Sequence, residues 1–233
     1  MDIRTNFNRN SLFLMLASLL LIALLQFIFL GQTDGLGVII TFLFAFLGCS
    51  LVAVFGGPWA GALMGAGYAL TGAATGQFTD LEWPLGLMIS FFALGAVAQL
   101  GAFRTWWSAM ATGFMMFYLG EVLAASLLVL ASRPDFGQAI LGIAFTFLGA
   151  IFSGLGFAGM FAFLLIFWVI RLPLPAWKRL LMSLPQAHKV FPNAEEPTPA
   201  VKMFGNLAKI AAMLALLAFV GFYLIWALAV GAL

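Results

Sequence analysis

Charged residues are what this sequence has least of. Only 8% of its 233 residues are Asp, Glu, Lys or Arg, whereas 64% are apolar. An ordinary soluble domain is about 25% charged, so this chain has too little polar surface to cover a water-soluble globule. Lipid must replace water over most of the surface. The composition predicts an all-α, polytopic transmembrane helical bundle whose first partner is the lipid bilayer.

Cysteine and histidine are almost absent as well. The one cysteine, Cys49, cannot form an internal disulfide or a thiolate cluster, and the one histidine, His188, lies in a polar segment. Without a histidine in any apolar run, histidine-ligated haem and a Ser-His-Asp site are both excluded from the membrane. The formal net charge of +2 is too small to indicate nucleic-acid binding. The sequence predicts a protein that is not an enzyme and holds no cofactor or metal.

Seven apolar runs are long enough to cross a bilayer, which takes about 20 helical residues. The first run is too long for a cleaved signal peptide, so we expect it to remain as the first helix. The predicted organisation is a six-span bundle over 1–171, a proline-rich cytoplasmic loop over 172–202 and a seventh helix over 203–233. The runs cover residues 11–31, 36–55, 58–76, 85–103, 106–131, 137–171 and 204–232.

Lysine and arginine alternate with acidic residues along the loops, which predicts the orientation. Short cytoplasmic loops are enriched in Lys and Arg. With the N-terminus inside, only Arg133 among the loop cations lies outside, together with Asp34, Asp80, Glu82 and Asp135. This favours a bacterial inner-membrane protein, and one long helix over 137–171 rather than two spans broken at "SGLG" (153–156). The predicted cytoplasmic residues are Arg4, Arg9, Arg104, Arg171, Lys178, Arg179, Lys189 and Lys202.

The loop over 172–202 contains one amphipathic stretch, "AWKRLLMSL" (176–184). Its apolar residues are Trp177, Leu180, Leu181 and Leu184, which oppose Lys178 and Arg179. One interpretation is an interfacial helix that lies on the inner leaflet. The other is a docking site for a cytoplasmic partner.

The third run carries small residues three or four positions apart, which form one face of a helix. Such faces let helix backbones approach closely in lipid. Intramembrane packing is one interpretation, and a sliding or partner-docking face is the other. The residues of this helix-packing face are Gly57, Gly61, Gly65, Ala69, Gly72 and Gly76.

Glu121, in "FMMFYLGEVLAAS" (114–126), is the only carboxylate inside a long apolar run. An ionised acid at such depth costs at least ~2.5 kcal/mol, so it should face the protein interior or a cavity. Three hypotheses follow. Glu121 binds a cationic or hydroxyl-bearing ligand or relays protons, it is a hydrogen-bonded strut to Gln99, Tyr68 or Thr71, or it fixes a contact with another subunit. Tyr118 shares its helix face.

The segment "VFGGPWAGALMGAGYALTG" (54–72) resembles the Gly-Pro-x-x-Gly-Ala-x-x-Gly-Ala signature of the S components, the substrate-binding membrane subunits of energy-coupling-factor vitamin transporters. The resemblance implies a substrate pocket capped by "TGQFTDLEWP" (75–84), with Glu82 and Trp83 as ligand contacts and Glu121 deeper. It also implies a transmembrane coupling subunit and two cytoplasmic ATPases as partners. The alternative is a structural or assembly subunit of a larger membrane complex, packed through its small-residue faces. A transporter would line an outward-opening cavity with Glu121, Tyr118, Gln99 and Tyr68.

Overall fold

The computed structural model describes residues 8–29, 35–76, 82–132, 136–152, 155–191 and 199–230. Every regular element in these ranges is a helix, which confirms the all-α prediction for the described part of the chain. The helices are α1 (Arg9–Ile28), α2 (Gly35–Gly56), α3 (Pro58–Ala74), α4 (Glu82–Gln99), α5 (Trp106–Ser132), α6 (Phe136–Phe152), α7 (Leu155–Ile170), α8 (Pro175–Met182), α9 (Ala187–Val190) and α10 (Pro199–Val230).

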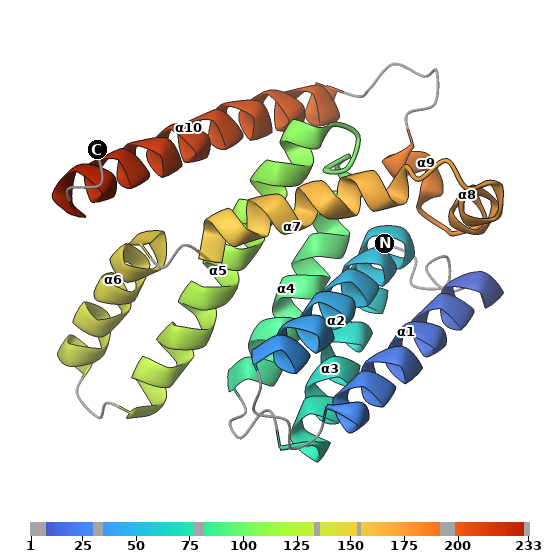
Figure 1. Ribbon diagram of the computed structural model, residues 1–233, viewed down its shortest axis with the longest axis horizontal. Helices are drawn as coiled ribbons and strands as arrows, with labels where there is room; N and C mark the ends of the chain where they lie inside the picture. The colour runs from blue at the N-terminus through green and yellow to red at the C-terminus, as the bar shows by residue number, and fades with distance from the viewer. Residues whose placement is uncertain are drawn as a thin grey trace.

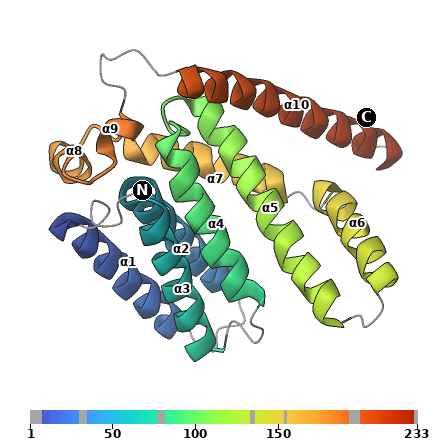
Figure 2. The ribbon, with the colours of Figure 1, turned by 180° about the vertical axis from the view of Figure 1, so that it is seen from behind.

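The first five helices lie side by side, and α7 and α10 pack on the first half of α5 at an incline (Figures 1 and 2). Helix α2 is the central element, because it contacts α1, α3, α4, α7 and α9. Helix α5 lies between the group formed by α1 to α4 and the group formed by α6, α7 and α10. It packs on α4 on one side and on α6, α7 and α10 on the other.

Three helices of the described chain are long and apolar enough to cross a membrane: Arg9–Ile28, Trp106–Ser132 and Val201–Ala218. A fourth candidate is the pair Gly159–Ile170 and Pro175–Met182, which is bent by 102°. Shorter apolar helices cover Leu43–Gly56, Gly86–Gln99 and Gly137–Thr146. The chain therefore has several helices with the length and composition of membrane spans.

Local sequence explains where two of these helices begin. At the start of α1, the Asn8 side chain accepts a 2.7 Å hydrogen bond from the backbone N–H of Ser11, and Ser11 Oγ accepts a 2.9 Å bond from the N–H of Asn8. This reciprocal pair satisfies two donors of the first helical turn. At the start of α3, Gly57 has φ 91°, a conformation that favours glycine. Pro58 follows at the first helical position, where its missing N–H costs nothing.

The run over 137–171 is not one continuous helix, so the preferred prediction for it was wrong. Helix α6 ends at Phe152 and α7 begins at Leu155, and the two point in clearly different directions in Figure 1. The intervening residues 153–154 lie outside the described part of the chain. Helix α6 starts beside the end of α5, and α7 ends near the loop that joins α4 to α5. The pair therefore still runs from one end of the bundle to the other.

The described loop cations that the sequence assigned to the cytoplasm gather at one end of the helices. Several contacts define this basic end. Ser183 accepts hydrogen bonds from Asn8 and Asn10, Arg104 reaches the carbonyl of Lys189, and Arg171 reaches the carbonyl of Phe103. Helix α10 also starts here, because Val201 lies against Gly101. The basic end carries Arg9, Arg104, Arg171, Lys178, Arg179, Lys189 and Lys202. Arg4 and Arg133 lie outside the described residues.

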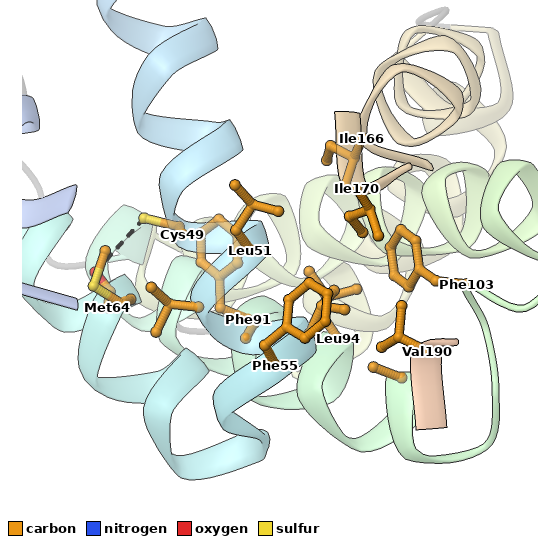
Figure 3. Close-up of a cluster of buried hydrophobic side chains, with 14 of the residues drawn as sticks. Cys49, Leu51, Phe55, Met64, Phe91, Leu94, Phe103, Ile166, Ile170 and Val190 are labelled. Carbon is orange, nitrogen blue, oxygen red and sulfur yellow. Dashed lines mark hydrogen bonds between the residues drawn. The ribbon is translucent and has the colours of Figure 1, made fainter. Parts of the chain in front are cut away.

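The main apolar core extends from the middle of the bundle to the basic end. Figure 3 shows Phe55 of α2, Phe103 of the α4–α5 loop and Val190 of α9 within it. Ile166 and Ile170 of α7 complete this part of the core, and Cys49 donates a 3.9 Å hydrogen bond to the carbonyl of Met64. Helix α10 packs on the main core through Phe204 and on α5 and α7 through a thin seam of small and sulfur-containing residues. The buried members of that seam are Met110, Ala111, Met160, Ala208, Ala212 and Ala215.

Candidate functional site

Among the predicted ligand residues whose side chains the structure describes, Gln99, Tyr68 and Tyr118 lie on three different helices. Gln99 is the last residue of α4 and lies half-buried at the basic end. Glu121 is fifteen positions beyond Trp106, the first residue of α5, which places its backbone about 22 Å from that end at a rise of 1.5 Å per residue. Gln99 is thus too far along the helices to share a pocket with Glu121.

The two predicted tyrosines lie on helices that α4 separates. Tyr68 of α3 is buried in the main core, beside Met64. Tyr118 of α5 is half-buried, and its ring stacks on Phe114 with the centroids 6.1 Å apart. Phe114 in turn packs on the seam that holds α10. Only Tyr118 therefore remains on the same helix face and at a similar depth as Glu121.

Glu82 and Trp83 are the first two residues of α4, at the end of the helices opposite the basic end. Their side chains, like that of Glu121, are not among those the structure describes. Along the helices, Glu82 and Trp83 stand at the start of α4 and Glu121 in the middle third of α5.

The backbone of Glu121 lies on a row of α5 residues whose two ends meet α7 and α6. Residues four apart form such rows on a helix. Here the row contains Gly113 and Phe117, which meet Gly159 of α7, and further along Val129, which meets Gly142 of α6. Glu121 falls between these two contacts. At the preceding residue, a Cβ added to Gly120 would lie 3.2 Å from Oγ of Ser90, so α4 also approaches this part of α5.

Small residues of α3 lie against the backbone of α4, as expected of a packing face. A Cβ at Gly65 would lie 2.8 Å from the carbonyl oxygen of Leu87, and one at Gly61 would lie 2.8 Å from the carbonyl carbon of Phe91. Gly57 is approached by Gly95 of α4 in the same way. Gly72 is buried in α3, whereas Gly76 lies past its end and is exposed, and a Cβ added there would meet no other atom within 4 Å.

A second close crossing joins α5 to α7 and was not identified from the sequence. A Cβ at Gly159 would lie 2.7 Å from Cδ2 of Phe117 and nearer still to the carbonyl oxygen of Gly113. The Phe117 ring cannot easily move, because it packs edge-on against Phe46 with the centroids 5.0 Å apart. The two glycines lie on distant segments of the chain, and the small residues near each of them do not show which helix will pack there.

The amphipathic stretch predicted at 176–184 forms α8, and together with α9 it covers the basic end of the bundle. We call residues 175–190 the end cover. Leu181 and Leu184 are buried in the main core, and Trp177 Nε1 donates a 2.8 Å hydrogen bond to the carbonyl of Val169. The N–H of Gln186 donates a 3.1 Å bond to the carbonyl of Phe55, at the end of α2. Leu181 and Leu184 of the end cover are thus packed on protein, whereas Met182 is exposed.

Arg171 connects α7 to the loop between α4 and α5. Its guanidinium donates hydrogen bonds to the carbonyls of Phe103 at 2.7 Å, Arg104 at 3.3 Å and Phe167 at 3.3 Å. It also lies 3.7 Å above the ring centroid of Phe167. The sequence assigned Arg171 only a role in topology, because nothing in a linear chain shows which distant carbonyls an arginine will reach.

No family model matches this chain, and neither the search of curated proteins nor the search of solved structures found a match. Within the described residues, no group of three or more His, Cys, Asp or Glu could hold a metal ion. The residues considered further as a candidate site are Glu121 of α5 and Tyr118, which lies one turn before it on the same helix face.

Replacing Arg171 with methionine should lower the thermal stability of the detergent-solubilised protein. The change leaves the buried carbonyl of Phe103 without its donor, which costs roughly 1–3 kcal/mol. Lys178→Met is the matched control, because Lys178 is an exposed cation on the end cover. Thermal unfolding followed by circular dichroism should place Arg171→Met several degrees below the control. Equal unfolding temperatures would contradict the bridging role.

Proposed function

We propose that this chain is the substrate-binding membrane subunit of a small-molecule transporter and has no catalytic activity of its own. In this proposal it crosses the bacterial inner membrane seven times, and α6 and α7 together make the sixth crossing. The basic end faces the cytoplasm, since lysine and arginine favour that side. The gathering of the described loop cations at one end supports this orientation, which also places the N-terminus inside.

The observation that carries the proposal is the position of Glu121 along α5, between the contact that α5 makes with α7 and the contact that it makes with α6. In a bilayer, interrupted helices are tolerated where the backbone is buried in protein or lines a water-filled cavity. Secondary transporters place their substrate sites near the midplane at such interruptions. An intramembrane acid likewise needs the protein interior or a cavity around it. In this proposal, the stretch of α5 between its contacts with α7 and α6 supplies the protein interior or cavity that Glu121 needs.

The ligand expected at this site is a small cation or a hydroxyl-bearing molecule. A carboxylate attracts a cation or accepts a hydrogen bond from a hydroxyl group. The half-buried Tyr118–Phe114 ring pair on the neighbouring turns offers an aromatic surface for the rest of the ligand. Glu82 and Trp83, at the opposite end from the basic residues, are candidates for the entrance. As the resemblance of residues 54–72 implies, a coupling subunit and two ATPases would supply the energy.

A structural or assembly subunit of a larger membrane complex is the second candidate, and α10 supports it. Among its described side chains, the buried ones lie in the two small clusters shared with α5 and α7, and many of the others are large, apolar and exposed. Either a partner subunit or lipid could cover this surface. The exposed residues are Met203, Leu207, Ile210, Met213, Leu214, Leu217, Val220, Leu224, Ile225 and Leu228.

Comparison of the wild type with Glu121→Gln tests the transport proposal. Both proteins are purified in mild detergent, and native mass spectrometry measures small molecules that remain bound. Glu195→Gln removes the same charge from the 172–202 loop and serves as the control. We expect a small molecule in the wild type and in the control. Its occupancy should fall at least about tenfold in Glu121→Gln, because a lost charge-assisted hydrogen bond is worth roughly 1.5–3 kcal/mol.

Two results would contradict the proposal. Equal occupancy in Glu121→Gln and in the control would remove Glu121 from the binding site. Stoichiometric partner proteins with no small molecule in any of the three samples would favour the structural subunit. Thermal unfolding of each variant, measured after exhaustive dialysis, shows whether Glu121→Gln also disturbs the fold.

A further inference from the structure

Helix α8 has one face packed on the protein and one face exposed. On the packed side, Leu181 is buried in the main core, and the Trp177 side chain donates its hydrogen bond to Val169 of α7. On the other side, four exposed residues recur at positions i, i+3, i+4 and i+7, so they form one continuous face of the helix. We call these residues the outer face of α8: Pro175, Lys178, Arg179 and Met182.

The outer face is basic, and no acid balances it. Arg179 Nε donates a 3.4 Å hydrogen bond to the carbonyl of Pro175, which holds its guanidinium beside the first turn of this face. Residues 171–190 contain no Asp or Glu. Within the described part of the chain, neither Lys178 nor Arg179 forms an ion pair. These two cations are therefore complementary to carboxylates on another molecule.

Exposed apolar side chains stand at both ends of the outer face. Met182 ends it with 49% of its surface exposed, and Leu174, immediately before α8, is 55% exposed. Met and Arg are enriched in protein–protein interfaces, where apolar contacts lie beside charged ones. The order apolar, basic, apolar along this helix therefore fits a protein surface that carries carboxylates between apolar residues.

The place of α8 favours a partner in water over a lipid. Its axis turns by 102° from that of α7, and with α9 it lies across the end of the bundle where α2 finishes (Figures 1 and 2). There the N–H of Gln186 reaches the carbonyl of Phe55. Because the packed side of α8 covers the end of the bundle, its outer face points away from the bundle. In the orientation proposed above, that direction is the cytoplasm.

We infer that the outer face of α8 docks the acidic surface of a cytoplasmic protein. Lys178 and Arg179 pair with carboxylates of this partner, and Met182 and Leu174 pack on apolar residues beside them. The inference rests on the proposed orientation of the chain, but not on Glu121 or on a bound small molecule. It therefore applies to a transporter subunit and to a structural subunit alike.

Photo-crosslinking in intact cells of the native host tests this docking. The full chain carries p-benzoylphenylalanine in place of Met182, and mass spectrometry identifies the molecule and the segment attached to it after irradiation. We expect one protein, attached through a segment rich in Asp and Glu. The yield should fall at least about tenfold when Lys178→Glu/Arg179→Glu is added, because this change sets like charges against each other across the interface.

The control is Arg9→Glu/Lys202→Glu, which makes the same change of charge at exposed positions of the basic end outside the end cover. It should keep the wild-type yield, and unfolding temperatures in detergent show that both double variants fold. An equal fall in both double variants would overturn the docking site in favour of general attraction to the basic end. Adducts with phospholipid alone or with a second copy of this chain, or the absence of any adduct, would overturn it as well.

A separate measurement tests the orientation on which the inference rests. Met182→Cys is combined with Cys49→Ala, which leaves one cysteine in the chain. A membrane-impermeant maleimide should label this cysteine in inverted vesicles and not in spheroplasts. Labelling in spheroplasts would overturn both the orientation and the docking of a cytoplasmic protein. A negative result in the Glu121 experiment leaves the docking standing, because neither measurement here involves a small molecule.

Discussion

Gly159→Leu is expected to prevent recovery of a folded, monodisperse protein. Gly159 lies where α7 crosses α5, and the atoms that face it are the backbone of Gly113 and the ring of Phe117. A backbone carbonyl cannot rotate away as a flexible side chain can, so the two helices must separate. Overpacked cores typically lose about 1–3 kcal/mol. We expect a loss above about 3 kcal/mol here, measured as a fall in detergent unfolding temperature or as aggregation on size exclusion.

Gly221→Leu is the matched control for this change. Gly221 lies on α10 with nothing within 4 Å of a Cβ position, so leucine finds open space there. Leucine also favours a helix over glycine by up to about 1 kcal/mol. The control should therefore be as stable as the wild type or slightly more stable. A Gly159→Leu protein as stable as Gly221→Leu would show that α5 and α7 do not cross at this point.

Phe103→Ala is expected to cause the second large loss of stability. Phe103 is fully buried in the loop between α4 and α5 and stacks on Phe163 of α7, with the centroids 5.7 Å apart. It lies between Ile170 and Val190 in Figure 3, so one ring contacts both α7 and the end cover. Truncation of a buried phenylalanine costs about 3–5 kcal/mol, because it leaves a cavity that the neighbours only partly fill.

Phe161→Ala separates this packing effect from the loss of apolar surface alone. Phe161 lies on α7 with 52% of its surface exposed, so its removal leaves no internal cavity. Thermal unfolding in detergent should leave Phe161→Ala close to the wild type and Phe103→Ala far below both. If the two variants unfold together, Phe103 is not part of the core that joins α7 to the end cover.

The glycine faces show which parts of the packing could be predicted from the sequence. In α3, several small residues repeat at helical spacing, so the face that meets α4 is visible in the sequence. Gly113 and Gly159 belong to helices with several other small residues, and neither glycine indicates its partner. The two glycines meet because the surfaces of α5 and α7 have complementary shapes. That complementarity can be seen only once the chain is folded.

For the α6–α7 pair and for the end cover, too, the sequence predicted some features and left others open. The "SGLG" segment indicated a break, whereas the charge pattern favoured a single passage. A broken pair satisfies both, because α6 and α7 still run from one end of the bundle to the other. The amphipathic pattern of 176–184 predicted α8 and its buried face, but not whether protein or lipid would cover that face. For Glu121, the sequence predicted a place well inside the fifth apolar run. The contacts of Gly113 with α7 and of Val129 with α6 show which helices pack on α5 before and after that place.

The end cover also affects how the protein is made. Ribosomes deliver α1 to α5 before the residues that cover their basic end, and domains generally form in that order. Until Leu181, Leu184 and Val190 have been synthesised, the buried rings of Phe55 and Phe103 lack part of their surroundings. A nascent chain that pauses near Arg171 would therefore present apolar surface at the membrane edge, where membrane chaperones or partner subunits could reach it. Newly made chains should be most vulnerable to proteolysis in that interval.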